Sequence, residues 1–340
     1  MFNVFDLQKQ LVASACPSGS EGERIGPLLA KLAKPFVDEV AVDPLGNVIC
    51  HKKGKGGKKI MMAAHMDAIG FIVTFVDDKG FVWFDGIGGH FPLMLVNTRV
   101  RFLNGTVGMI RVKEYPKALA KPTTQVRISD LFIDIGAADK KDAEKKVKIG
   151  DMAIFEGESV KVAGGNVMGP YADDLIACVV LLMTMEKVKS SDNDLYYVFT
   201  SQEEVGCRGA QAAAFGIDPD IGLACDVCGT GDTPANDEVH MAVSLGKGPT
   251  IKIKDSSVIC SPVLNEKLRK IAKDNKIVYQ DEILTGGGTD TCKMQLTHSG
   301  VHSTCISVPT RNIHSAVEMF NIKDVEDAVK LMAAAVTSKL

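Results

Sequence analysis

The sequence has no long hydrophobic run and no large excess of charge of either sign. Its longest apolar stretch, from Leu175 to Met185, is too short to cross a bilayer. The formal net charge of the 340 residues is -3 at pH 7, so electrostatics give no argument for a nucleic-acid partner or an anionic membrane. The first residues, Met1 to Leu11, lack the basic and apolar segments of a signal peptide. From these absences we expect a cytoplasmic protein that binds neither nucleic acid nor a membrane.

Several familiar motifs are also missing. Neither Gly-x-Ser-x-Gly nor His-Glu-x-x-His occurs, so the commonest serine-hydrolase and zinc-protease signatures are absent. The nine cysteines are scattered and odd in number, which indicates free thiols in a reducing compartment. Cys225 and Cys228 have the spacing of a redox or zinc pair, but no second pair and no directly following helix accompany them. Redox and structural-zinc functions are therefore not favoured.

The pattern of hydrophobic residues changes twice along the chain. Near both ends, helical patterns alternate with short apolar runs, which is typical of an α/β domain. Between Gly70 and about Val162, short alternating segments are separated by turns, and Asn104-Gly105 is a strong hairpin signal. We therefore expect a compact β-barrel domain inserted into an α/β domain.

Local signals predict several element boundaries. Ser20 is expected to cap a helix, because apolar residues recur at helical spacing from Ile25. Ser261 and Pro262 have the types expected at a helix start, which predicts a helix to about Asp274. The segment from Lys52 to Lys59 is rich in glycine and lysine but lacks the order of a phosphate-binding loop, so we expect the solvated tip of a hairpin.

Potential metal ligands follow four of the predicted strands. They are His65 after residues 60–64, Glu203-Glu204 after residues 195–199, Asp226 after residues 221–225 and His314 after residues 305–308. Ligands of open α/β sheets bind at the carboxyl ends of the strands, so we expect these side chains to lie close together. Histidine combined with carboxylates suits Zn²⁺, Co²⁺ or Mn²⁺.

Each of these residues also has a simpler interpretation. His65 and Asp67 could be a buried hydrogen-bonded pair, and Glu203-Glu204 could be a solvated acidic turn. Asp173-Asp174 precede the apolar run that starts at Leu175, so helix capping would account for either of them. These separate interpretations do not predict that all of these residues lie together at one edge of the sheet.

Alternation of side chains along an extended chain suggests a division of roles. Adjacent Glu203 and Glu204 would point in roughly opposite directions, so that one could hold a metal and the other could transfer a proton. His65 and Asp67 would share a face, so that Asp67 could orient the imidazole of His65.

Six blocks of sequence, in order along nearly the whole chain, resemble the tetrahedral (TET) aminopeptidases, a family that includes glutamyl aminopeptidases and proteins described as endoglucanase M. The blocks are Ala64-His65-Met66-Asp67-Ala68-Ile69-Gly70, Asp173-Asp174, Gln202-Glu203-Glu204-Val205-Gly206-Cys207-Arg208-Gly209-Ala210, Asp226 with Gly231-Asp232-Thr233-Pro234, Gly287-Gly288-Thr289-Asp290, and Ile306-Ser307-Val308-Pro309-Thr310-Arg311-Asn312-Ile313-His314-Ser315.

The resemblance implies a mixed-sheet α/β fold of the phosphorylase/hydrolase-like type. Its catalytic domain would comprise residues 1–69 and 163–340, and residues 70–162 would form an inserted β-barrel that mediates dimerisation and assembly. The family implies a homo-oligomer, in which dimers build towards a tetrahedral dodecamer. The implied reaction is the hydrolysis of N-terminal residues from peptides that have a free N-terminus.

The resemblance also implies the roles of individual residues. His65 and Asp226 would bind one divalent ion, Glu204 and His314 the other, and Asp173 both, with zinc or cobalt as the expected metal and manganese as a further candidate. A hydroxide bridging the two ions would attack the peptide, because metal binding lowers the pKa of water to about 7. Glu203 would be the general base, and Asp67 would orient His65.

Three departures from the family pattern leave alternatives open. Ala68 stands where the family usually has Glu, Leu175 where it has Arg, and Asn312 where it has Tyr. Ala68 and Leu175 allow a catalytically weak paralogue that binds metal and assembles. A cellulase is the other alternative, but adjacent Glu203 and Glu204 are poorly disposed to flank a glycosidic bond, and one tryptophan and five tyrosines offer few stacking platforms for sugars.

Overall fold

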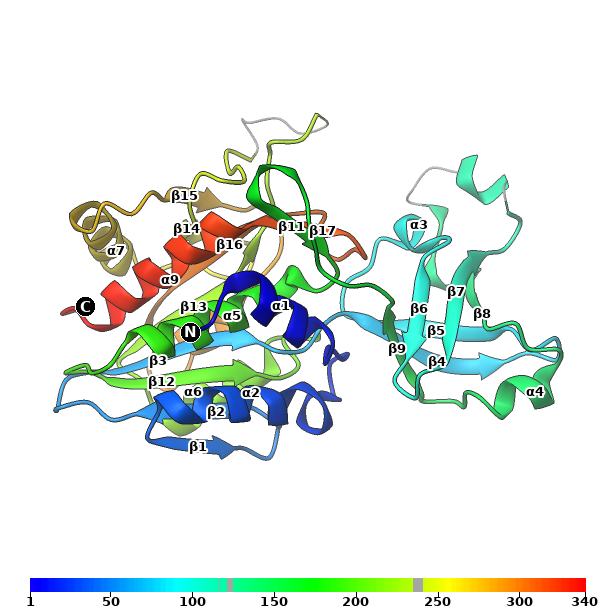
Figure 1. Cartoon of the computed structure of the whole chain (residues 1–340), viewed down its shortest axis with the longest axis horizontal. Helices are drawn as coiled ribbons and strands as arrows, with labels where there is room; N and C mark the ends of the chain where they lie inside the picture. The colour runs from blue at the N-terminus through cyan, green and yellow to red at the C-terminus, as the bar shows by residue number, and fades with distance from the viewer. Residues whose placement is uncertain (116, 121–124, 235–240) are drawn as a thin grey trace.

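A large mixed sheet flanked by helices and a separate closed barrel make up the fold (Figure 1). The computed structural model describes residues 1–115, 117–120, 125–234 and 241–340. Within these residues, the sheet has eleven strands and the barrel has six. The predicted fold class, an α/β domain with an inserted β-barrel, is confirmed.

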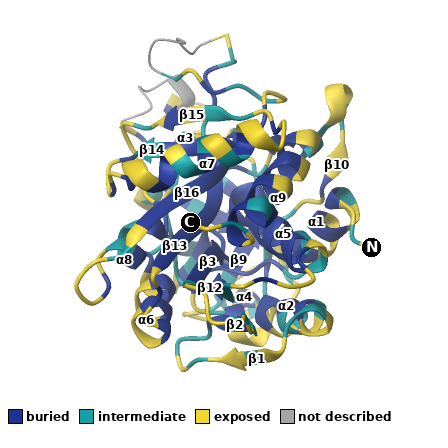
Figure 2. Ribbon diagram, turned by 90° about the vertical axis from the view of Figure 1, so that its left-hand side faces the viewer, coloured by how far each residue is buried: buried dark blue, intermediate teal, exposed yellow. Residues whose placement is uncertain are grey.

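Four parallel strands form the centre of the sheet. In spatial order they are β12 (Asp194–Thr200), β3 (Lys59–His65), β13 (Ile221–Cys228) and β16 (His302–Arg311). All four are mostly buried, in agreement with their continuous apolar runs (Figure 2). Because they run in the same direction, their carboxyl ends lie at one edge of the sheet, where the predicted ligands follow them.

The remaining strands surround this centre. They are β1 (Glu39–Val42) and β2 (Val48–Lys52) at one side, β17 (Glu318–Asn321), β11 (Asn166–Gly169) and β10 (Val160–Lys161) at the other, and β14 (Thr250–Lys254) with β15 (Gln280–Ile283), which branch from β16. The predicted hairpin tip from Lys52 to Lys59 is wrong, because β12 lies between β2 and β3. That segment is instead a connection that passes the end of β12.

Helices cover both faces of the sheet. On β3, Met62 and Ala64 pack with the cluster that contains α5 (Ala172–Lys187), and the alternating Met61 and Ala63 pack with α6 (Arg208–Ile217). Neighbouring side chains of a strand point to opposite faces, so the two helices lie on opposite sides. The other helices are α1 (Val4–Val12), α2 (Ile25–Ala33), α7 (Pro262–Asp274) and α9 (Ile322–Val336) on the α5 side, and short α8 (Thr291–Gln295) beside α6.

The helix boundaries agree only partly with the sequence signals. Ser261 caps α7 as predicted, because its hydroxyl accepts a hydrogen bond from the backbone N–H of Leu264. Ser20 does not cap α2, because a 3₁₀ turn, Glu21–Glu23, intervenes and the Ser20 hydroxyl contacts the sulfur of Met152 instead. Among the described residues, no helix combines the length and the apolar character that crossing a membrane requires.

The inserted domain is a closed barrel that lies to one side of the sheet (Figure 1). Its strands, in order around the barrel, are β4 (Gly70–Val76), β5 (Val82–Ile87), β8 (Leu131–Asp134), β7 (Val107–Val112), β6 (Arg99–Phe102) and β9 (Met152–Phe155). The short helices α3 (Pro92–Leu95) and α4 (Lys140–Glu144) lie in its connections. The hairpin predicted at Asn104-Gly105 joins β6 to β7. Since β10 already pairs in the large sheet, we propose that the insertion ends between Phe155 and Val160 rather than at Val162.

Candidate metal centre

Six of the seven predicted site residues line one cavity at the carboxyl edge of the parallel strands. The cavity has a volume of about 390 Å³, and the six are His65, Asp173, Glu203, Glu204, Asp226 and His314. The seventh, Asp67, is fully buried behind them. Five segments far apart in the sequence therefore bring their polar residues to one place, and four of them do so at the carboxyl ends of strands, as predicted.

Asp173 lies at the centre of this cluster. Its Oδ1 is 3.0 Å from Nε2 of His65, and its Oδ2 is 3.4 Å from Nε2 of His314. Asp173 and Asp174 lie in the first turn of α5, but their backbone angles are not helical. The peptide bond between them is cis. Neither carboxylate caps the helix, so the capping interpretation is wrong. Burial opposes ionisation of Asp173, but hydrogen bonds from His314 and His65 outweigh it and lower its pKa.

The imidazole of His65 is held by the backbone of Asp67. His65 Nδ1 donates to the main-chain carbonyl of Asp67 at 3.0 Å, whereas the nearer carboxylate oxygen of Asp67 is 3.6 Å away. This contact leaves Nε2 facing Asp173, as a metal ligand requires. Burial lowers the pKa of His65, but Asp173, Asp174 and Asp67 together hold it well above its ordinary value.

The carboxylate of Asp67 instead holds the backbone of the two glutamates. The backbone N–H of Glu203 donates to Asp67 Oδ1 at 3.0 Å, and that of Glu204 donates to Oδ2 at 3.2 Å. The hydroxyl of Ser18 also donates to Oδ2, at 2.6 Å. Asp67 therefore fixes the position of the acidic pair relative to His65.

Glu318 on β17 holds the other side of the cluster, and sequence reasoning did not identify it. Its buried carboxylate accepts the backbone N–H of Asp173 at 2.9 Å and that of His314 at 2.8 Å. His314 follows β16 with a φ of 63° and directs Nε2 to within 3.3 Å of Glu204 Oε2. Burial would lower the pKa of His314, yet hydrogen bonds with Asp173 and Glu204 raise it to about 11.

The cavity holds more buried negative charge than its own cations neutralise. Burial raises the pKa of Glu203, Glu204 and Asp226 above the ordinary values, and repulsion from neighbouring carboxylates adds to this effect. Lys252, in the cavity wall, is paired with the carboxylate of Glu282. Several carboxylates buried so close together are stable only if cations or protons neutralise part of their charge.

The donor atoms fall into two groups that fit divalent metal ions. One group is His65, Asp173, Asp174 and Asp226, and the other is Asp173, Glu204 and His314. All five predicted ligands belong to them, and Asp173 is common to both. Two buried carboxylate oxygens, Asp174 Oδ1 and Glu204 Oε1, have no hydrogen-bond partner within the described part of the chain. Unpaired oxygens beside imidazoles fit a cation, and Asp174 is a donor that the sequence reasoning left out.

The inserted barrel contributes one wall of the cavity. Gly88 and Gly89 follow β5, and a Cβ atom at Gly88 would lie 3.2 Å from the side chain of Glu204. At Gly89 it would lie 3.2 Å from Nδ1 of His314. Glycine at both positions therefore lets the barrel approach the candidate ligands closely.

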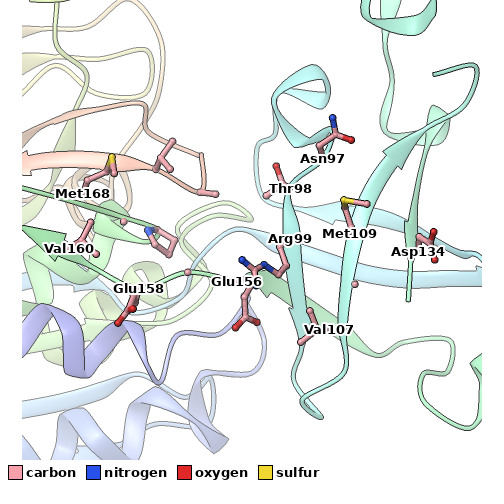
Figure 3. A pocket seen from close by; sticks show the side chains of 16 residues that line it. Asn97, Thr98, Arg99, Val107, Met109, Asp134, Glu156, Glu158, Val160 and Met168 are labelled. Atoms are coloured by element: carbon pink, nitrogen blue, oxygen red, sulfur yellow. The ribbon is translucent and has the colours of Figure 1, made fainter. Parts of the chain in front are cut away.

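Other polar features do not join this centre. A larger hollow of about 610 Å³ lies between β6 and β7 of the barrel and the β10–β11 hairpin (Figure 3). Its lining includes Arg99 and Glu156 but none of the predicted site residues. Cys225 and Cys228 are buried in β13, and neither belongs to a potential metal group among the described residues.

Comparison with known sequences identifies relatives along the whole chain. The family model of the M42 glutamyl aminopeptidases matches residues 46–331. A protein of Acetivibrio thermocellus named "Putative aminopeptidase" is 45% identical over 335 residues, which cover 98% of each chain. The lysyl aminopeptidase of Pyrococcus furiosus is 33% identical, over 97% of this chain and 96% of its own.

Comparison with solved structures agrees. An aminopeptidase from the archaeon Desulfurococcus kamchatkensis superimposes with a TM-score of 0.94 and 37% identity, over 98% of this chain and 94% of its own. The TET1 peptidase of Pyrococcus horikoshii is described as assembling into a tetrahedron or a large octahedral shell. It superimposes with a TM-score of 0.88 and 31% identity, over 99% of this chain and 100% of its own. An endoglucanase from Thermotoga maritima superimposes with a TM-score of 0.80 and 28% identity, over 99% of this chain and 97% of its own. The chain belongs to the M42 glutamyl aminopeptidase family.

Proposed function

We propose that this protein is a metal-dependent aminopeptidase that removes residues one at a time from the free N-terminus of peptides. The observation that carries the proposal is the position of Asp173. It belongs to both groups of potential metal ligands, in a cavity that Glu203 also lines. Family membership supports the reaction class and a divalent metal requirement.

In this proposal the two groups would hold two divalent ions, with zinc or cobalt favoured and manganese as a further candidate. His65 and Asp226 would hold the first ion, Glu204 and His314 would hold the second, and Asp173 would contribute to both. When bound, such ions polarise a peptide carbonyl and lower the pKa of water. Asp67 and Glu318 keep the ligands in position through backbone hydrogen bonds.

Glu203 acts as the general base. Its Oε2 lies 3.8 Å from Nε2 of His65, so it borders the first group without belonging to it. Burial raises the pKa of Glu203 well above its ordinary value, which makes its carboxylate a stronger proton acceptor. Glu203 takes a proton from the attacking water and delivers it to the departing amine.

The positions of the three departures from the family pattern support an active enzyme over a weak paralogue. The side chains of Ala68 and Leu175 are fully buried, and neither lines the cavity. The side-chain amide of Asn312 donates to the backbone carbonyl of Val317 at 3.2 Å. None of the three side chains therefore lines the cavity that holds the groups we assign to the reaction.

Acetylating the N-terminus of a peptide is expected to reduce its cleavage steeply. A cavity rich in buried carboxylates attracts the ammonium group of a free N-terminus, and an acetyl group removes that charge. Mass spectrometry of the products over time should show ladders that shorten by one residue from free ends only.

The same assay distinguishes the alternatives. Equal hydrolysis of blocked and free peptides would indicate an endopeptidase or a deblocking enzyme. If peptides are not cleaved but sugars are released from cello-oligosaccharides, the protein is an endoglucanase. Absence of both, with metal bound, would favour the weak paralogue.

We further propose that the barrel mediates assembly of a homo-oligomer, in which dimers build towards a tetrahedral dodecamer. Phe91 and Met94, at and within α3, have exposed fractions of 59% and 51%. Substituting both with glutamate is expected to give a smaller assembly, because two charges would be buried at an apolar contact. Sedimentation velocity measures the change.

Phe215 on α6 provides the matched control, because it is an apolar residue of the other domain with an exposed fraction of 66%. Phe215→Glu should leave the sedimentation profile unchanged. If the Phe91→Glu/Met94→Glu variant sediments like the wild type while remaining folded, α3 is not part of the contact.

A further inference from the structure

A third group of potential metal ligands borders the candidate metal centre and differs from it in chemistry. It consists of Glu203, Cys207 and Asp290, whose ligand atoms all lie within 4.8 Å of one another. The group shares no residue with the two groups described above. It also contains a thiol, which they lack.

The chain holds Cys207 firmly against Glu203. The backbone N–H of Cys207 donates to the main-chain carbonyl of Glu203 at 2.8 Å. Its thiol donates to Glu203 Oε1 at 3.0 Å. Cys207 is buried, with a φ of 54°, at the start of α6. Its sulfur is therefore directed at the carboxylate that we assign as the general base.

A second thiol lies beside the first. Cys292 on α8 is in hydrogen-bond contact with the thiol of Cys207, and it is the most exposed of the nine cysteines, at an intermediate level. Both cysteines are free thiols. Packing of α8 against α6 brings these residues together from distant parts of the sequence.

Asp290 supplies an independent indication that something binds here. Its side chain is 2% exposed, and its Oδ2 accepts a hydrogen bond from the hydroxyl of Thr200. Its Oδ1 is buried and has no hydrogen-bond partner among the described residues. A buried carboxylate oxygen without a partner is costly unless a cation or a proton occupies the site.

We propose that Glu203, Cys207 and Asp290, with Cys292 beside them, form a third cation site that takes thiophilic divalent ions such as Zn²⁺ and Cd²⁺. Thiolate ligands select such ions over Mg²⁺ and Mn²⁺, which prefer oxygen donors. On binding, the sulfur of Cys207 exchanges its proton for the ion, and the proton leaves to solvent.

Occupation of this site has a consequence for catalysis. An ion bound to the carboxylate of Glu203 removes the proton acceptor, so excess Zn²⁺ or Cd²⁺ inhibits an enzyme that manganese does not inhibit. This consequence rests on the proposed function, because it requires Glu203 to be the base. Binding of the ion does not rest on it.

Ultraviolet absorption during titration with Cd²⁺ tests the binding directly. Cadmium bound to sulfur gives a charge-transfer band, and the ligands of the other two groups contain no sulfur. The titration uses the full chain with a phosphine reductant, so that Cys207 and Cys292 stay reduced. The wild type should develop the band at stoichiometric Cd²⁺. Mn²⁺ should produce no such band.

Three variants test which thiol binds the Cd²⁺ that gives the band. Cys207→Ala should weaken Cd²⁺ binding by about 100-fold or more, since changes outside the ligand shell alone commonly cost 10- to 100-fold. Cys292→Ala should weaken it less. Cys50→Ala is the matched control, because Cys50 is a buried thiol on β2 that belongs to no potential metal group in the described ranges. Cys207→Ser serves if the alanine variant does not fold.

The outcomes separate this proposal from the proposed function. A band of wild-type strength in folded Cys207→Ala or Cys207→Ser would overturn the site, and so would its absence in the wild type. Inhibition of peptide turnover by excess Zn²⁺ should disappear in Cys207→Ala, measured relative to the variant's own uninhibited rate. Equal inhibition of both proteins would overturn the inhibitory role. A protein without peptide turnover that still shows the band would contradict only the proposed function.

Discussion

Replacing Glu203 with glutamine is expected to lower peptide turnover by about 100-fold or more, while the content of Mn²⁺, an ion that the proposed third site does not take, stays unchanged in the manganese-loaded protein. Glutamine keeps the shape of the side chain and loses the ability to accept a proton. Glu203 lies outside both groups that contain the predicted ligands, so the loss should fall on kcat. Elemental analysis of the purified variant, beside its rate on a free-amine peptide, makes the measurement.

The neighbouring substitution, Glu204→Gln, should fail in a different way. Glu204 Oε1 is buried without a partner, and Oε2 lies 3.3 Å from His314, as expected for a ligand. An amide is a weak neutral ligand, so metal occupancy should fall together with activity. Two adjacent glutamates would then be distinguished by metal content rather than by rate.

Glu158→Gln serves as the control for both, because that glutamate is largely exposed and does not line the cavity. It should change stability by less than about 0.5 kcal/mol and leave turnover unchanged. If Glu203→Gln loses metal while Glu204→Gln keeps it, the two roles are reversed. If neither variant differs from the control, the solvated-turn interpretation of this pair is correct.

The clustering of His65, Glu203 and Asp226 could be predicted because it depends only on strand direction. Continuous apolar runs indicate buried parallel strands, and parallel strands place their carboxyl ends at one edge. The order of the strands could not be read in the same way. β12, which comes from a distant part of the chain, lies between β2 and β3 in the sheet. No local pattern near Lys52 to Lys59 indicates that these two strands are not neighbours.

The supporting contacts could not be predicted for the same reason. Glu318 is one acidic residue among many in the sequence, and only the pairing of β16 with β17 brings it beneath Asp173 and His314. Gly88 belongs to the inserted barrel, which the sequence separates from the catalytic domain. Cys207 and Cys292 meet only because α6 packs against α8. These contacts depend on tertiary packing, which periodicity along the chain does not encode.

Asp67 is the residue whose predicted role changes most in the light of its contacts, and its substitution should therefore have a large effect. The sequence suggested that its carboxylate orients His65, but the ring of His65 donates to the main-chain carbonyl of Asp67 at 3.0 Å. The carboxylate accepts the backbone N–H groups of Glu203 and Glu204. We therefore expect Asp67→Asn to disturb the acidic pair while leaving the carbonyl contact with His65 available.

The expected effect of Asp67→Asn is a loss of about 10- to 100-fold in metal affinity or activity, as for other residues that support metal ligands. The new amide would turn donor hydrogens towards backbone N–H groups, leaving buried donors without an acceptor. Ser18→Ala is the graded control, because it removes only the hydroxyl that donates to Asp67 Oδ2 and should cost far less. Metal titration and steady-state kinetics of both variants measure the difference. Wild-type affinity and rate in folded Asp67→Asn would mean that the positions of Glu203 and Glu204 do not depend on this carboxylate.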